Sequence, residues 1–256
     1  MLLAIDVGNT HTVIGIFDGE EKKCGWRIST VKSWTADELR IHAVMLLESG
    51  CVNPADIDAA IMCSVVPRLT ANWQQALHDM RDIELLLCTA EARGDAFPCT
   101  YPYPNEIGMD YIADAVGAVA LYGAPVVVFD FGTATNISII DRDGNFKGGI
   151  IAPGVETGAA ALFSKATQLT SIALRAPEHV VGQSTDECIR AGVVLGEAAR
   201  VDGLSQLIFE ELGYETPVIA TGGLATSISA YSKKITATDP ELTLSGLRVA
   251  FEALTQ

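Results

Sequence analysis

The chain has 256 residues, of which 49% are hydrophobic and 19% charged, so it is long and apolar enough to fold as one large domain or two small ones. Its formal net charge of −15 predicts a surface that repels nucleic acid and anionic membranes, and no basic run reverses this locally. A nucleotide site on such a protein would have to work through local backbone donors and metal ions.

The cysteines and the N-terminal residues indicate the cellular compartment in which we expect the protein. Six cysteines are scattered without a C-x-x-C pair, which favours neither zinc nor disulfides and fits a reducing cytoplasm. The opening MLLAID has no basic region and reaches an aspartate at position 6, so we expect no signal peptide. No apolar run approaches the length of a membrane span, and we expect a soluble protein without a membrane partner.

The first predicted element is a hairpin in the stretch LLAIDVGNTHTVIGIFDGE, with strands at residues 2–5 and 13–17. The DVGNT segment that joins them can be an ordinary structural turn. It can also be a phosphate loop, in which Gly8 lets the backbone approach an anion and Asn9 and Thr10 donate hydrogen bonds. Asp6 could then hold a hydrated Mg²⁺.

Helices and strands alternate through the rest of the first half. Helical patterns cover residues 35–49 and 69–80, and buried strands are predicted at 58–66 and 83–88. Residues 89–108 form a long loop that contains Pro and Gly, and loops of this length are uncommon unless they are functional. A helix at 108–123 follows, and we place a domain boundary within it.

The second half opens on VVVFDFGTATNISIIDRDG, which begins at Val126 and repeats the pattern of the first hairpin. Without a gap, Asp6 aligns with Asp130, Gly8 with Gly132, Asn9 with Thr133 and Thr12 with Asn136. A long helix at 185–212, a strand at 217–221 and helices at 222–232 and 242–254 complete this half. Two matching copies half a chain apart indicate a duplicated domain, each copy a mixed sheet flanked by helices, at residues 1–117 and 118–256.

Two ribonuclease-H-like domains that each begin with a D-x-G hairpin resemble the actin, sugar-kinase and Hsp70 superfamily, an α/β fold in which ATP lies between the domains. DVGNT, SVVP, Y-x-x-P-x-x-x-G-x-D, DFGTAT, GGIIAPG, VVGQST, VIATGGLA and DP-x-LTL-x-GL follow one another as in type III pantothenate kinases. The resemblance covers nearly the whole chain. It implies transfer of phosphate from Mg-ATP to the primary alcohol of pantothenate, giving 4′-phosphopantothenate, the first step of coenzyme A biosynthesis.

The resemblance also implies roles for individual residues. Asp110 looks like the general base, Asp130 like the ligand of a monovalent cation (K⁺ or NH₄⁺), and Thr133 like an ATP contact. The ATP phosphates would be lined by Asp6, Val7, Gly8, Asn9, Thr10, His11, Thr12 and Val13. Pantothenate would be bound by Tyr101, Gly108, Met109, Asp110, Tyr111 and Thr185. Members of the family are typically homodimers with the substrate pocket near the subunit interface.

Local chemistry offers simpler interpretations at three positions. Asp110 begins a helix, where a carboxylate is favoured by the helix dipole alone. Thr185 could be an ordinary N-cap, and Asp114 is expected to be solvated. Tyr111 stands where the family has arginine, and a phenol lacks the planar five-donor fork of that side chain. Two alternatives therefore stay open: a nucleotide-binding regulator with little or no catalysis, and a related kinase for another hydroxyl substrate.

Overall fold

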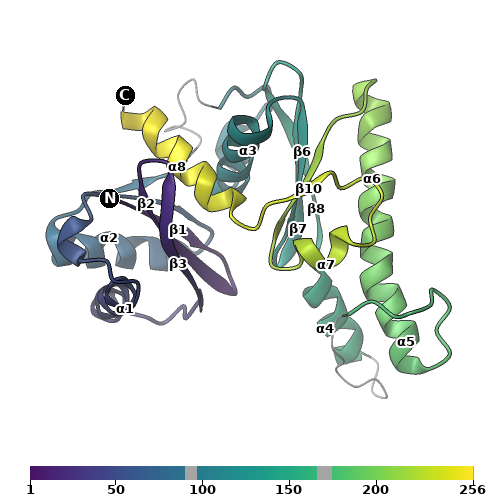
Figure 1. Ribbon diagram of the computed structural model, residues 1–256, viewed down its shortest axis with the longest axis horizontal. Helices are drawn as coiled ribbons and strands as arrows, with labels where there is room; N and C mark the ends of the chain where they lie inside the picture. The colour runs from purple at the N-terminus through teal and green to yellow at the C-terminus, as the bar shows by residue number, and fades with distance from the viewer. Residues whose placement is uncertain (90–96, 166–174, 256) are drawn as a thin grey trace. The chain divides into compact units, whose positions relative to one another are not determined.

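The computed structural model describes residues 1–89, 97–165 and 175–255, which form two compact units (Figure 1). The first unit comprises Met1–Leu121 together with the C-terminal segment from Leu242 onward, and the second comprises Tyr122–Glu241. Residues 90–96 of the predicted loop at 89–108 lie outside the described residues, and its later part contains the short 3₁₀ helix η3 (Pro104–Glu106).

The first unit is built on a five-stranded mixed sheet in the order β3-β2-β1-β4-β5. Its strands are β1 (Leu2–Val7), β2 (His11–Asp18), β3 (Glu21–Ser29), β4 (Ala59–Ser64) and β5 (Leu85–Leu87). β1, β2 and β3 pair antiparallel, whereas β4 and β5 continue the sheet in parallel. The sheet thus joins a predicted hairpin to two crossover strands, as the alternation of strands and helices indicated.

Helices cover both faces of this sheet. α1 (Ala36–Ser49) and α2 (Pro67–Arg81) pack against one face around a core that includes Trp73. α1 begins with a capping box between Thr35 and Glu38, and α2 begins at a proline, which is pre-organised for the first helical turn. α8 (Leu242–Thr255) contacts β1, β2 and β4.

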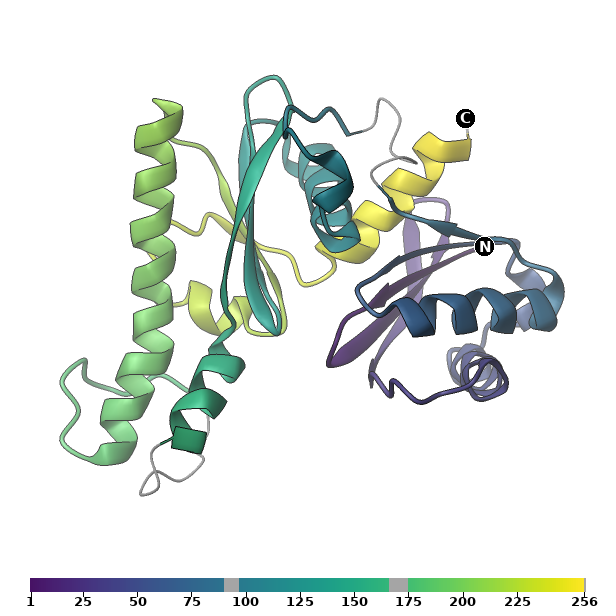
Figure 2. The same cartoon turned by 180° about the vertical axis from the view of Figure 1, so that it is seen from behind.

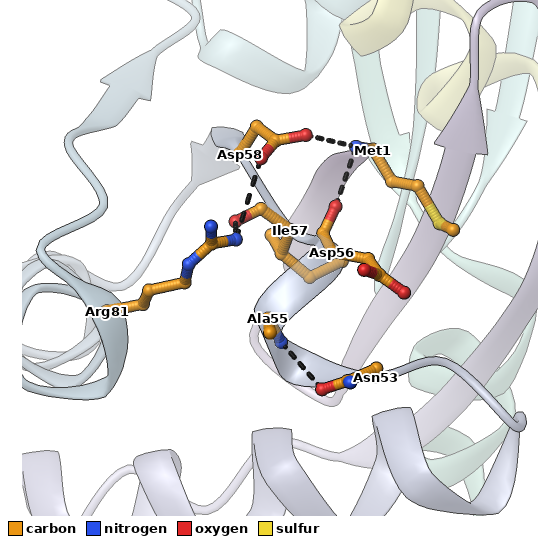
Figure 3. A network of polar contacts seen from close by, with 7 residues as sticks. All are labelled: Met1, Asn53, Ala55, Asp56, Ile57, Asp58 and Arg81. Carbon is orange, nitrogen blue, oxygen red and sulfur yellow. Dashed lines mark hydrogen bonds and ion pairs between the residues drawn. The ribbon is translucent and has the colours of Figure 1, made fainter.

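The start of β1 is tied to the loop before β4 by a polar network (Figure 3). The Met1 ammonium donates to the Asp56 carbonyl and to Asp58 Oδ2, both at 2.8 Å. Arg81 at the end of α2 donates to the Ile57 carbonyl at 2.7 Å and lies 3.5 Å from Asp58 Oδ1. These contacts support the register in which the carboxyl ends of β1 and β4 lie side by side.

The second unit repeats the sheet of the first, in the order β8-β7-β6-β9-β10. Its strands are β6 (Val126–Phe131), β7 (Ala134–Ile140), β8 (Phe146–Pro153), β9 (Val218–Gly222) and β10 (Ala237–Thr238). Its helices are α4 (Val155–Lys165), α5 (Thr185–Arg190), α6 (Gly196–Leu212) and the short α7 (Ala225–Ser229). Both views show the long α6 running beside the sheet (Figure 1 and Figure 2).

The shared strand order confirms two duplicated ribonuclease-H-like folds, but the gap-free alignment of the hairpins is wrong by one residue beyond the loop. Asp6 pairs with Val13, and Asp130 pairs with Asn136. The structural equivalent of Thr12 is therefore Thr135, not Asn136. The reason is that the loop of the second hairpin is one residue shorter than that of the first.

The observed division differs from the predicted boundary after residue 117, because the first unit extends to Leu121 and includes α8. α8 meets α3 (Met109–Tyr122) at two glycines, Gly117 and Gly246, where a Cβ on either would collide with the backbone of the other helix. Thr243 also donates a hydrogen bond of 2.7 Å to Asp114. The expectation that Asp114 is solvated is wrong, since its side chain is buried in this contact.

Candidate functional site

The predicted phosphate loop closes tightly at the end of β1. The Gly8 N–H donates to the His11 carbonyl at 3.0 Å, and a Cβ on Gly8 would press on that oxygen. Lys32 donates to Asn9 Oδ1 at 2.8 Å, which places a cation beside the loop. Beyond the loop, the Thr12 and Thr30 hydroxyls lie 2.9 Å apart, and Thr12 is buried. The segment 6–13 is thus a compact turn with a lysine next to it.

Asp6 lies in an environment that opposes its charge. The pKa of its carboxyl is raised to about 6, chiefly by burial, and the nearby charge of Asp110 contributes to this rise. A hydrogen bond from Cys63 Sγ to Asp6 Oδ1 at 3.2 Å and the charge of Arg27 act in the opposite direction. Cys63 stands opposite Asp6 in the β1–β4 ladder, and burial raises the pKa of its thiol well above the usual range, so it donates as a neutral thiol.

Replacing Asp6 by asparagine is expected to stabilise the protein at neutral pH. An aspartate whose folded pKa is raised loses stability as pH rises from its unfolded pKa near 4 to its folded pKa near 6. Asparagine does not ionise and can still accept from Cys63, so the gain should be on the order of 3 kcal/mol at pH 7.5 and vanish at pH 3.5. Thermal unfolding of both proteins at the two pH values measures this, and an equal difference at both would refute the electrostatic cause.

Asp110 lies in the first turn of α3, where its Oδ1 accepts the Tyr111 N–H at 3.0 Å. Burial raises the pKa of this carboxyl. A Cβ at Gly108 would collide with Asp110 Oδ1, so a larger residue there would displace the Asp110 carboxylate. The predicted base therefore lies close enough to Asp6 for their charges to interact within the first unit.

The other residues of the first unit that are predicted to bind pantothenate lie near this turn in the sequence. Met109 is the first residue of α3 and Tyr111 is buried in its first turn. Tyr101 lies earlier in the loop and packs edge-on against Tyr103, with ring centroids 6.5 Å apart. Nothing in the structure explains tyrosine at the position where the family has arginine.

The second hairpin presents Asp130 at the end of β6. The Gly132 N–H donates to the Ala134 carbonyl at 3.0 Å, which closes the loop as Gly8 does in the first hairpin. Gly222 at the end of β9 has φ of +87°, and a Cβ there would collide with Asp130 Oδ1 and the Phe131 amide. Only glycine leaves room for the Asp130 carboxylate at this point.

The predicted ATP contact, Thr133, lies in the loop of this hairpin. Its carbonyl accepts the Gly154 N–H at 3.2 Å and the Thr157 hydroxyl at 2.6 Å. Gly154 joins β8 to α4, and Thr157 lies in the first turn of α4. The loop therefore has a fixed backbone position within the second unit.

Thr185 is the first residue of α5, and the cap of this helix is Ser184, whose Oγ accepts the Glu187 N–H at 3.2 Å. The N-cap interpretation of Thr185 is therefore wrong by one residue. Thr185 lines an open cavity of about 730 Å³ in the second unit, together with Leu162, Gly182, Gln183, Ser184, Cys188, Ile189, Gly192 and Val193.

Several site features escaped the sequence analysis. Cys63 looked like an ordinary core residue, although its place directly before SVVP on a strand parallel to β1 could have marked it. Glu197 and Arg200 of α6 form hydrogen bonds with Thr135. The sequence feature that could have identified them is a glutamate among apolar residues on one face of the helix.

Three further observations concern metals, thiols and membranes. In the described ranges, no three His, Cys, Asp or Glu side chains gather as a metal-binding group. The six cysteines all fall within those ranges, and each is free. None of the helices that the structure describes has the length and apolar character of a membrane span.

Comparison with known proteins gives the family. The model of the family "type III pantothenate kinase" matches residues 2–206. The type III pantothenate kinase of Thermomicrobium roseum is 41% identical over 254 residues, covering 99% of this chain and 98% of its own.

Solved structures share the fold at much lower identity. A putative N-acetylmannosamine kinase from Listeria monocytogenes superposes with a TM-score of 0.56 at 11% identity, covering 100% of this chain and 99% of its own. A putative Baf family transcriptional activator from Campylobacter jejuni has a TM-score of 0.59 at 17% identity and covers 98% of both chains. The match to the family model and the full-length relative are decisive: this chain belongs to the type III pantothenate kinase family.

Proposed function

We propose that this protein transfers the γ-phosphoryl group of ATP to the primary alcohol of pantothenate and forms 4′-phosphopantothenate, the first step of coenzyme A biosynthesis. The observation that carries the proposal is the partly buried Asp110, whose charge acts on Asp6, in a chain of this family. No observation favours the regulator or the kinase for another substrate, since the likeness to the Campylobacter protein concerns the fold alone.

Asp110 acts as the general base. Phosphoryl transfer needs mainly positioning and charge neutralisation, with one acceptor for the proton of the attacking hydroxyl. Burial raises the pKa of Asp110 and so makes its carboxylate a better proton acceptor than an exposed aspartate. Tyr101, Gly108, Met109, Tyr111 and Thr185 are the proposed contacts of pantothenate.

The first hairpin binds the phosphates. The loop from Asp6 to Val13 offers backbone N–H groups and short hydroxyls, and Lys32 adds a positive charge beside Asn9. The Asp6 carboxylate, held by the Cys63 thiol, suits a Mg²⁺ ion bound through water. When bound with ATP, Mg²⁺ neutralises phosphate charge.

In the second unit, Asp130 is the proposed ligand of K⁺ or NH₄⁺ and Thr133 the proposed contact of ATP. The carboxylate of Asp130 and the nearby Ala134 carbonyl, which is held by the Gly132 N–H, are hard oxygen donors that suit such a cation. We also propose that the protein works as a homodimer in the cytoplasm, as the resemblance implies.

Activity is expected to need a monovalent cation, with potassium or ammonium far better than sodium. Sodium is smaller and holds its water more tightly, so a site shaped for potassium fits it poorly. Initial rates in matched potassium, ammonium and sodium buffers measure this preference. Equal rates in sodium and potassium would contradict the site at Asp130, and Asp130→Asn should remove the preference.

A coupled ADP-release assay with pantothenate, Mg-ATP and potassium tests the proposed reaction. ADP release that depends on pantothenate supports it. Release at the same rate without pantothenate would be ATP hydrolysis and would contradict the proposal.

A further inference from the structure

A pair of opposite charges, of which one is buried, lies in the second unit, outside the residues assigned above. Glu197 and Arg200 are one turn apart on α6 and form an ion pair, and Glu197 is only 6% exposed. Glu197 Oε1 accepts the Thr135 hydroxyl at 3.0 Å. Arg200 Nη2 donates to Thr135 Oγ1 at 3.1 Å and to the Pro153 carbonyl at 2.9 Å.

These bonds reach β7, which follows the loop 132–134, and the end of β8, which pairs with the start of β7. Thr135 follows the loop in β7, and Pro153, the last residue of β8, is the ladder partner of Ala134. The next residue, Gly154, donates to the Thr133 carbonyl, and a Cβ on it would collide with the carbonyls of Gly132 and Thr133. The charge pair therefore holds the start of β7 and the end of β8, which lie next to the loop.

The charged side chains of Glu197 and Arg200 on α6 face the sheet. A π-helical turn, Ala191–Leu195 (η4), separates α5 from α6 and shifts the face that the following residues present. Glu197 then falls in the buried stripe of Val194, Ala198 and Val201. Because Glu197 is buried, desolvation opposes the gain from its pairing with Arg200. The pair is therefore weak support for stability, and its place here favours a role in fixing local geometry.

We propose that Glu197 and Arg200 are positioning residues, which hold the loop 132–134 in its nucleotide-binding conformation through Thr135 and the Pro153 carbonyl. The inference rests on the proposed function, in which Thr133 contacts ATP. It assigns to α6 a role in nucleotide affinity and none in pantothenate binding.

The test compares Thr135→Val and Arg200→Met with the conservative Thr135→Ser. Losing a hydrogen bond to a charged group should raise KM for ATP, and Kd for Mg-ADP by calorimetry, about ten- to a hundredfold. KM for pantothenate should stay within about twofold, because that contact is untouched. Thr135→Ser keeps the hydroxyl and should restore the wild-type values. Glu252→Gln, which breaks the Arg248–Glu252 pair at 2.6 Å on α8, is the matched control and should change neither KM.

Each outcome decides the inference. If Thr135→Val and Arg200→Met lower only the thermal midpoint and the active fraction, with unchanged Kd for Mg-ADP, the pair is structural and the proposal is overturned. If wild-type protein binds Mg-ADP but does not phosphorylate pantothenate, the proposed function fails while the Kd comparison still decides the positioning role. If wild-type protein does not bind Mg-ADP, both proposals are overturned.

Discussion

Asp110→Asn is expected to lower kcat by about 10²–10⁴-fold, the usual contribution of a general base. The amide is nearly isosteric and its oxygen can still accept the Tyr111 N–H, but it does not take the proton of the substrate hydroxyl. KM for ATP should change little. Steady-state kinetics of the purified variant, with circular dichroism to confirm folding, measure the effect.

Asp114→Asn is the matched control for this variant. Asp114 is a buried carboxylate of α3, one turn after Asp110, and it accepts a hydrogen bond from Thr243 that asparagine can keep. Its kcat should stay close to that of wild type. Near-normal turnover in folded Asp110→Asn would remove Asp110 from the role of base.

Gly246→Ala is expected to give the largest loss of stability. The new Cβ would run into the Ala113 carbonyl, which is backbone and therefore cannot rotate away. Overpacking of this kind costs about 1–3 kcal/mol and sometimes more, and we expect the upper end. Because α3 carries Asp110, kcat should fall as well.

Gly203→Ala provides the comparison, since Gly203 lies within α6 with nothing near its Cβ position. That change should stabilise the protein by about 0.5–1 kcal/mol, because alanine is the better helix former. Thermal unfolding of both variants measures the contrast. Equal midpoints would show that α3 and α8 are not packed as closely as described.

The hairpins and most helices could be predicted from the sequence because their signals are local. The repeated D-x-G turn indicated the duplication, and the periodicity of residues 35–49 and 69–80 indicated α1 and α2. β3 was not predicted, although Cys24, Trp26 and Ile28 alternate as in a half-buried strand. Its charged outer face hid this alternation.

What the sequence could not show depends on contacts between distant segments. The packing of α8 with the first unit rests on Gly117 and Gly246, and small residues alone do not identify a partner helix. The one-residue difference between the hairpins became visible only in the strand registers. For the site, the roles of the acidic residues stay predictions from the sequence motifs, whereas the bonds of Cys63 to Asp6 and of Glu197 to Thr135 required the sheet pairing and the helix face.

The most direct measurement is identification of the product by mass spectrometry after incubation with pantothenate, Mg-ATP and potassium. A phosphorylated pantothenate should form in equal amount to ADP, carry its phosphate on the primary alcohol, and be absent with Asp110→Asn. ADP formation without a phosphorylated product, or ATP binding without any turnover, would contradict the proposed function.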